Sequence, residues 1–173
     1  LVTQYDGDNF SQNSCLSSGK QKQVHFEQYF DEKSVFAAIR KRLENGDCVC
    51  WVRNTVFDAL SAYEKAGKEF GQQNIILFHS RFIMGDRLNI ENKIMESFGP
   101  ESGQETRQGK LVISTQVIEQ SLDVDFDFMV SDLAPIDLII QRAGRLHRHK
   151  RTKSGDRTDI QTNAVTRFWG FSC

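Results

Sequence analysis

The sequence predicts an α/β domain in which helices cover both faces of a parallel sheet. Short segments that are apolar throughout alternate with segments whose apolar residues recur at helical spacing. Strands that lack polar alternation are typical of sheets buried on both faces. The length of 173 residues fits one domain, and 39% hydrophobic with 26% charged residues is a globular composition.

The amino-terminal part is predicted to be a linker, a strand and a helix. Residues 1–22 are polar and rich in Ser, Asn, Gln, Gly and Asp, which indicates a flexible linker. Residues 22–29 alternate loosely in polarity and are interpreted as a strand. Residues 31–44 carry apolar side chains at helical spacing, and the Asn45-Gly46 pair that follows is a helix stop.

In the central part, predicted strands alternate with predicted helices, and the predicted domain spans residues 23–150. The predicted strands are residues 48–52, 74–78, 111–114 and 128–131. The predicted helices are residues 55–67, 84–98 and 137–147. Residues 99–109 are polar, and Pro100 helps to end the second of these helices. Residues 151–173 stay open: residues 165–171 are either a closing strand or part of a truncated or non-native tail.

Charge and cysteine content limit the class of protein. The net charge is −1, so contact with nucleic acid must come from a local patch. One such patch is a basic cluster within twelve residues: Arg142, Arg145, Arg148, Lys150, Arg151 and Lys153. Of four cysteines, none forms a C-x-x-C pair; Cys48 and Cys50 are interpreted as buried free thiols in a reducing compartment.

No targeting, membrane or metal signal stands out in the sequence. There is no signal peptide and no apolar run of about 18 residues, so we expect a cytoplasmic protein with no membrane contact. His147 and His149 have the spacing H-x-H, but no further ligands lie nearby in the sequence, so we expect no metal site.

The segment 141–148 carries a glutamine and three arginines within two predicted helical turns. Gln141, Arg145 and Arg148 stand at i, i+4 and i+7 and would share one face of a helix. Two guanidinium forks and an amide that orients water are what a triphosphate-splitting site needs. The alternative is a solvated basic helix face.

The segment 112–125 runs from a strand into a turn or short helix. Ser114 and Thr115 stand at the carboxyl end of the strand, where open α/β sheets bind ligands, and could bond a nucleic-acid phosphate. Asp123 could accept from a ribose hydroxyl or tether an arginine. The alternative is that these residues are helix caps and turn carboxylates.

These two segments resemble motifs V and VI of superfamily 2 helicases. Motif V corresponds to residues 115–123, and motif VI, Q-R-x-G-R-x-x-R, to residues 141–148. Upstream, residues 51–55 resemble motif IV, and residues 77–82 with Arg87 resemble the next strand-end motif. The four motifs follow in the expected order.

Within superfamily 2, the particular residues of these motifs resemble those of the CRISPR-associated helicase–nucleases of type I systems. The runs S-T-Q-V-I-E-Q-S-L-D-V-D and Q-R-A-G-R-L-H-R-H carry it, and Ser121 stands where many superfamily 2 members place glycine. The resemblance implies ATP-driven movement on single-stranded DNA, an HD nuclease domain of the same enzyme, and recruitment by an RNA-guided surveillance complex.

Two motifs that the family's ATPase needs are absent from the sequence. There is no G-x-x-x-x-G-K-[ST] loop for the phosphates and no D-E-x-[DH] box for magnesium. The resemblance therefore implies the second RecA-like lobe alone, with Mg²⁺ held by a first lobe, and we expect this chain by itself not to hydrolyse ATP.

The resemblance also implies a role for each site residue. Arg145 and Arg148 would be arginine fingers at the ATP phosphates beside Gly144, Gln141 would position water, and Asp123 would link the nucleotide to lobe closure. The DNA backbone would be held by Asn54, Thr55, Ser80, Arg81, Ser114 and Thr115. Two alternatives stay open: the second lobe of another superfamily 2 helicase, acting for example on RNA, and a non-catalytic module that binds a protein partner.

Overall fold

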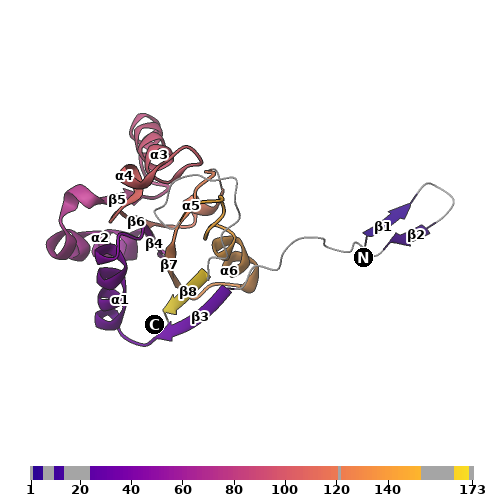
Figure 1. Cartoon of the computed structure of the whole chain (residues 1–173), viewed down its shortest axis with the longest axis horizontal. Helices are drawn as coiled ribbons and strands as arrows, with labels where there is room; N and C mark the ends of the chain where they lie inside the picture. Colours follow the sequence, from indigo (N-terminus) through magenta and orange to yellow (C-terminus); the bar gives the residue numbers. More distant parts are fainter. Residues whose placement is uncertain (1, 6–9, 14–23, 121, 153–165, 172–173) are drawn as a thin grey trace.

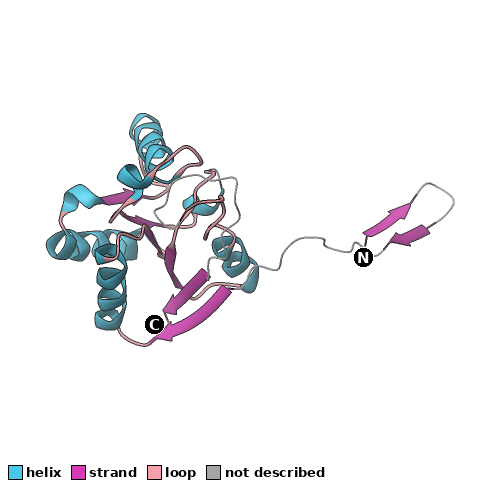
Figure 2. Ribbon diagram, in the orientation of Figure 1, coloured by secondary structure: helices cyan, strands magenta, loops and turns pink. Residues whose placement is uncertain are grey.

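A six-stranded parallel sheet forms the centre of the molecule (Figures 1 and 2). The computed structural model describes residues 2–5, 10–13, 24–120, 122–152 and 166–171. The strand order is β3-β8-β7-β4-β6-β5. The strands are β3 (Val24–Tyr29), β4 (Val49–Val52), β5 (Ile75–Phe78), β6 (Leu111–Ser114), β7 (Phe128–Asp132) and β8 (Thr166–Phe171).

Helices cover both faces of this sheet, as the sequence predicts. The helices are α1 (Glu32–Glu44), α2 (Val56–Phe70), α3 (Met84–Phe98), α4 (Gln104–Arg107), α5 (Val117–Gln120) and α6 (Ile136–Ala143), with a 3-10 turn at Gln72–Asn74. One core cluster joins α1 and α2 to Val49 and Trp51 of β4. The other joins α3, α5 and the end of α6 to Cys50 and Val52 of the same strand. Successive residues of β4 therefore enter opposite cores, which explains its apolar run.

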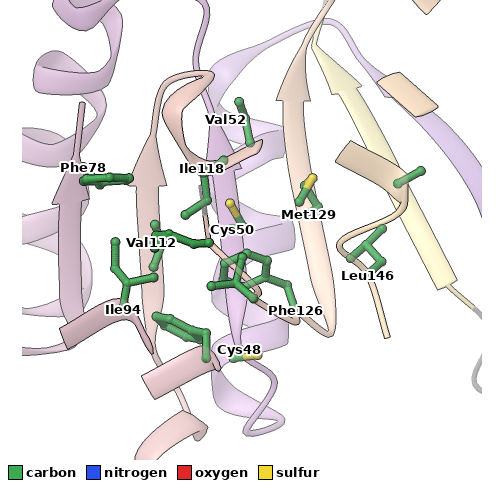
Figure 3. Packing of buried hydrophobic residues seen from close by; sticks show 14 residues of the cluster. Cys48, Cys50, Val52, Phe78, Ile94, Val112, Ile118, Phe126, Met129 and Leu146 are labelled. Atoms are coloured by element: carbon green, nitrogen blue, oxygen red, sulfur yellow. The ribbon is translucent and has the colours of Figure 1, made fainter. Parts of the chain in front are cut away.

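The second core includes buried residues of the segments 112–125 and 141–148, among them Val112, Ile118 and Leu146 (Figure 3). Phe126 and Leu146 are fully buried there, and their backbones pair in an isolated parallel bridge. Cys48 and Cys50 are buried free thiols, as predicted. Burial raises the pKa of both thiols, so both stay protonated at neutral pH.

Helix starts follow local capping chemistry. The Asp31 side chain accepts from the Ser34 N–H at the start of α1. Thr55 does the same for the Asp58 N–H at the start of α2. Gly71, at φ 83°, follows the last residue of α2 and turns the chain into the next strand.

The structure differs from the predicted elements in several places, among them α2, which runs three residues further than predicted, to Phe70. Two short strands, β1 (Val2–Tyr5) and β2 (Phe10–Asn13), pair antiparallel within the predicted linker. Within the segment that the sequence left open, Thr166–Phe171 form β8, which pairs with both β3 and β7. Helix α6 ends at Ala143, four residues earlier than predicted. Residues 14–20 of the linker, Ser121, and residues 153–163 lie outside the described residues.

In the described part of the chain, no helix has both the length and the hydropathy that a membrane span needs.

Candidate functional site

The carboxyl ends of β4, β5, β6 and β7 lie at one edge of the sheet. Ser114 at the end of β6 is in register with Val52 of β4 and with Phe78 of β5. Val52 is also in register with Ser131 of β7. Because all strands run parallel, the loops that follow them leave from this same edge, the usual ligand side of an open α/β sheet. We call it the carboxyl edge.

Asn54 and Thr55 lie exposed on the carboxyl edge. The Asn54 side chain donates to the Leu133 carbonyl over 2.7 Å, and the Asn54 backbone carbonyl accepts from the Gln116 side chain over 3.1 Å. Thr55 caps α2, and its hydroxyl also donates to Asp58 over 2.6 Å. The loops after β4, β6 and β7 are thus bonded together at the predicted DNA-binding residues.

Ser80 and Arg81 lie exposed in the turn after β5. His79 stabilises this turn, because its Nδ1 accepts from the Arg81 N–H over 3.2 Å. The His79 ring stacks on Phe82 with 4.1 Å between ring centroids. Burial lowers the pKa of His79, and the positive Arg81 lowers it further. A neutral imidazole is therefore favoured, which suits a structural role under this turn.

Ser114 and Thr115 are both buried. The Ser114 hydroxyl donates to the Phe78 carbonyl over 2.8 Å and contacts the Thr115 carbonyl at 3.0 Å. In this structure the Ser114 hydroxyl therefore links β5 to β6, and its assignment to a nucleic-acid phosphate stays a prediction. Thr115 is 3% exposed at the same strand end.

The segment 141–148 is not one continuous helix, which corrects the prediction of a shared helical face. Helix α6 ends at Ala143, and Gly144 caps it in an exposed position. Beyond the cap the chain makes a further turn, in which the Arg145 N–H donates to the Arg142 carbonyl over 2.9 Å, and it then pairs with Phe126. The Phe126 N–H donates to the Arg145 carbonyl over 3.0 Å, and the His147 N–H to the Phe126 carbonyl over 2.9 Å. Gln141 thus lies on a helix, whereas Arg145 and Arg148 lie on a segment that runs beside Phe126.

Arg145 and Arg148 each contact the loop that follows α5. The Arg145 guanidinium donates to the carbonyls of Glu119 and Leu122. Burial lowers the pKa of Arg145, and the neighbouring positive charge of Arg148 adds to this. Arg148 Nε lies 2.8 Å from Asp123 Oδ1, and these side chains are 45% and 46% exposed. The predicted nucleotide residues Asp123, Arg145 and Arg148 are therefore adjacent, with Gly144 and Gln141 just before them in the chain.

The sequence places Arg142 and Arg151 in the predicted basic patch, but the structure buries both of them beside the predicted fingers. Arg142 is fully buried and bonds Glu119 Oε1 over 2.6 Å. Arg151 is 6% exposed and bonds Asp125 Oδ2 over 2.6 Å. The available signal was the presence of acidic residues in the segment 119–125, which provides a carboxylate for each of these two buried arginines.

Asp132 is a further residue whose role the sequence did not indicate. It is 4% exposed at the end of β7, and its Oδ2 accepts from Arg53 Nε over 3.0 Å and from the Asn54 N–H over 2.9 Å. A carboxylate directly after a buried parallel strand was the available signal.

Comparison with known proteins identifies the fold and the motifs together. Residues 45–151 match the family model described as CRISPR-associated nuclease/helicase Cas3, C-terminal. Over 169 residues the chain is 36% identical to the CRISPR-associated nuclease/helicase Cas3 of Streptococcus thermophilus, covering 98% of this chain and 17% of that protein.

Solved structures agree with the family match. The crystal structure of T. fusca Cas3-ATP has a TM-score of 0.78 at 27% identity, covering 94% of this chain and 20% of that one. A chain of a CRISPR RNA-guided surveillance complex, pre-nicking, has a TM-score of 0.72 at 29% identity, covering 88% and 19%. The chain spans about a fifth of the length of these relatives. The RecA-like parallel fold and the family resemblance predicted from the motifs are confirmed, and the chain belongs to the CRISPR-associated nuclease/helicase Cas3 family, as its C-terminal helicase lobe.

Proposed function

We propose that this chain is the second ATPase lobe of an ATP-dependent single-stranded DNA helicase in CRISPR interference. The observation that carries the proposal is the adjacency of Asp123, Arg145 and Arg148 within residues that match the family model. Because the chain belongs to this family, we no longer consider the alternative that it is the second lobe of an unrelated superfamily 2 RNA helicase.

In this proposal Arg145 and Arg148 are the arginine fingers. A surface ion pair in water contributes little to stability, so the exposed Arg148–Asp123 pair can open when a phosphate competes for the guanidinium. Arg145 is held by carbonyl oxygens, which satisfy its donors without neutralising its charge. Both residues therefore fit a triphosphate, whose splitting by the helicase would supply the energy for movement. Gln141 would orient the attacking water.

The carboxyl edge would hold the DNA backbone through Asn54, Thr55, Ser80, Arg81 and Thr115. Apart from Thr115, these residues are exposed, and they come from loops after three adjacent strands. Amide, hydroxyl and guanidinium donors that read phosphate carry no base information, so binding would be blind to sequence.

The remaining components of the machine would lie on other domains. A first RecA-like lobe would hold Mg²⁺ and the ATP phosphates, because this sequence has neither motif for them. An HD nuclease domain and an RNA-guided surveillance complex complete the proposed partners. The T. fusca Cas3-ATP structure and the surveillance-complex structure, in which similar chains occur, support this assignment.

A salt series of binding to fluorescent single-stranded DNA tests the carboxyl edge. We expect weak binding without sequence preference that falls roughly tenfold between 50 and 200 mM salt, if about three phosphates are contacted. Arg81→Ala should weaken binding at low salt and reduce the slope of log K against log salt by about 0.7.

Arg40→Ala is the matched control, because Arg40 is an exposed arginine of α1 paired with Glu69. It should leave both affinity and slope unchanged. Absence of binding at the lowest salt, or equal effects of Arg81→Ala and Arg40→Ala, would contradict a DNA groove on this lobe.

One observation favours a second candidate, a surface that binds another protein. Leu133, Ile136 and Ile140 are 54%, 72% and 64% exposed, and the two isoleucines stand one helical turn apart on α6. Capture of a protein partner by the chain, together with no affinity for single-stranded DNA, would favour this candidate over the DNA-binding lobe.

A further inference from the structure

Two buried ion pairs lie end to end between the arginine segment and the carboxyl edge. Arg142 of α6 is fully buried, and its Nε donates to Glu119 Oε1 over 2.6 Å. Its Nη1 donates to Ser131 Oγ over 2.6 Å and to the Asp132 carbonyl over 3.1 Å. Arg142 thus joins α5 to the end of β7.

Asp132 continues the connection to the carboxyl edge. Its Oδ2 accepts both Arg53 Nε, at 3.0 Å, and the Asn54 N–H, at 2.9 Å. The Asn54 side chain also bonds the residue after Asp132, because it donates to the Leu133 carbonyl over 2.7 Å. The position of Asn54 is therefore set by the backbone and the carboxylate of the residues that end β7.

Glu119 continues the connection in the other direction. Its carboxylate holds Arg142, and its backbone carbonyl accepts from the Arg145 guanidinium. Hydrogen bonds therefore connect Arg145 through Glu119, Arg142 and Asp132 to Asn54. Within Glu119 and Asp132 the connection passes from the backbone carbonyl to the side-chain carboxylate.

The chemistry of this series is unusual for a protein core. A buried ion pair stabilises little compared with apolar residues of the same volume, whereas it fixes the geometry of the groups that it joins. Two atoms in its middle, Arg142 Nη2 and Asp132 Oδ1, are buried and have no hydrogen-bond partner. Such atoms are unfavourable where they stand and become satisfied if the groups around them rearrange.

We propose that Glu119, Arg142 and Asp132 are positioning residues that form a relay between the carboxyl edge and Arg145. DNA bound at Asn54 would shift Asp132 and Arg142, and through Glu119 would change the carbonyl contact that holds Arg145. This inference rests on the proposed function, since it links the DNA-binding and nucleotide-facing residues named there.

The first test needs no ligand and follows the arginine Nε–H signals of the ¹⁵N-labelled 173-residue chain by NMR. Asp132→Asn keeps the side-chain shape and removes the charge. We expect the Arg142 and Arg145 signals to shift, although Arg145 does not contact Asp132, while the Arg40 signal stays in place. Asp47→Asn is the matched control, because Asp47 pairs with Arg42 over 3.0 Å outside the relay. An unshifted Arg145 signal in Asp132→Asn would overturn the relay.

The second test adds an oligothymidine single strand and follows both ends of the relay. In the parent chain the Asn54 and Thr55 amides and the Arg145 Nε–H should shift with one midpoint concentration. Arg142→Lys keeps the charge and loses the planar fork that bonds Glu119 and Ser131 together. In this variant the Asn54 and Thr55 shifts should persist and the Arg145 shift should be lost.

The outcomes separate the relay from the proposed function. An Arg145 response that persists in a folded Arg142→Lys chain would overturn the relay and leave DNA binding intact. No response of Asn54 and Thr55 in the parent chain would overturn the DNA-binding edge, while the ligand-free comparison still decides the relay. If Arg142→Lys does not fold, Asp132→Asn takes its place in the titration.

Discussion

At the scale of single residues, the arginines of the carboxyl-terminal segment divide by burial. Arg142 and Arg151 are enclosed and bound to Glu119 and Asp125. Arg148 keeps 45% of its side chain exposed. The segment repeats arginine every third residue, and each of these arginines contacts residues 119–125. Only the partly exposed ones retain donors that another molecule can reach.

Removing either proposed finger should abolish ATP turnover in the full-length family enzyme that carries this chain. Arg145→Ala and Arg148→Ala should each lower kcat by about 10³–10⁵-fold, because a finger stabilises charge that develops in the transition state. ATP binding, measured by titration calorimetry, should change little. Arg40→Ala serves as the control, and normal turnover in both finger variants would refute the assignment.

Arg142→Ala should destabilise the lobe severely. Loss of one partner leaves Glu119 charged and buried, at a cost of about 3–5 kcal/mol in the free energy of unfolding. Urea denaturation of the chain measures this change. Lys65→Ala breaks the exposed pair with Glu32 and should change stability by less than about 1 kcal/mol. Equal effects of the two variants would show that burial does not set the stability contribution.

At the scale of secondary-structure elements, the short α6 decides how the arginine segment is presented. After Gly144 the chain makes one further turn and then pairs with Phe126 through backbone hydrogen bonds. His147 adopts φ 42° just beyond that pairing, in a region that L residues rarely occupy. The consequence is that Arg145 and Arg148 face the loop after α5 instead of projecting from a helix.

The amino-terminal caps of α1 and α2 allow the DNA role of Thr55 to be separated from its capping role. Thr55→Ala should lower stability by about 1 kcal/mol and should also weaken binding to single-stranded DNA, because Thr55 lies on the carboxyl edge. Asp31→Ala removes the corresponding cap of α1, which follows β3, a strand that β8 and β7 separate from β4, and should lower stability alone. Unchanged DNA affinity in Thr55→Ala would make Thr55 a cap only.

At the scale of the whole molecule, parallel topology gathers the candidate residues. β4, β5, β6 and β7 are adjacent and parallel, so one edge collects every loop that follows them. Most residues that bind phosphate in the proposed function come from those loops, which are far apart in the sequence and close in space.

The isolated chain should not hydrolyse ATP. It lacks the phosphate-binding loop and the magnesium-binding box, so the proposed fingers have no bound triphosphate to act on. A phosphate-release assay on the purified chain, with and without single-stranded DNA, should match the buffer blank. Turnover that persists in an Arg145→Ala, Arg148→Ala double variant would indicate contamination, whereas turnover lost with those residues would contradict the prediction.

The fold class, the central strands and the positions of the motifs were predictable from the sequence. Apolar runs of strand length reflect local burial, which neighbouring residues in the sequence reveal. The predicted runs correspond to the observed strands β4, β5, β6 and β7. The insertion of β8 between β3 and β7 was not predictable, because a strand's neighbours depend on contacts distant in sequence. The end of α6 was misplaced for the same reason, since pairing with Phe126 overrides the helical pattern.

By itself, the sequence determined which chemistry this lobe carries: the arginines, the strand-end hydroxyls and amides, and the absence of a phosphate-binding loop. Only the tertiary structure decided which of those groups are available. Ser114 and Arg142 have the same residue types as their exposed counterparts, yet the fold encloses them and fills their hydrogen-bonding capacity. Burial is a property of the packed chain, because water is excluded by neighbours that come from distant parts of the sequence.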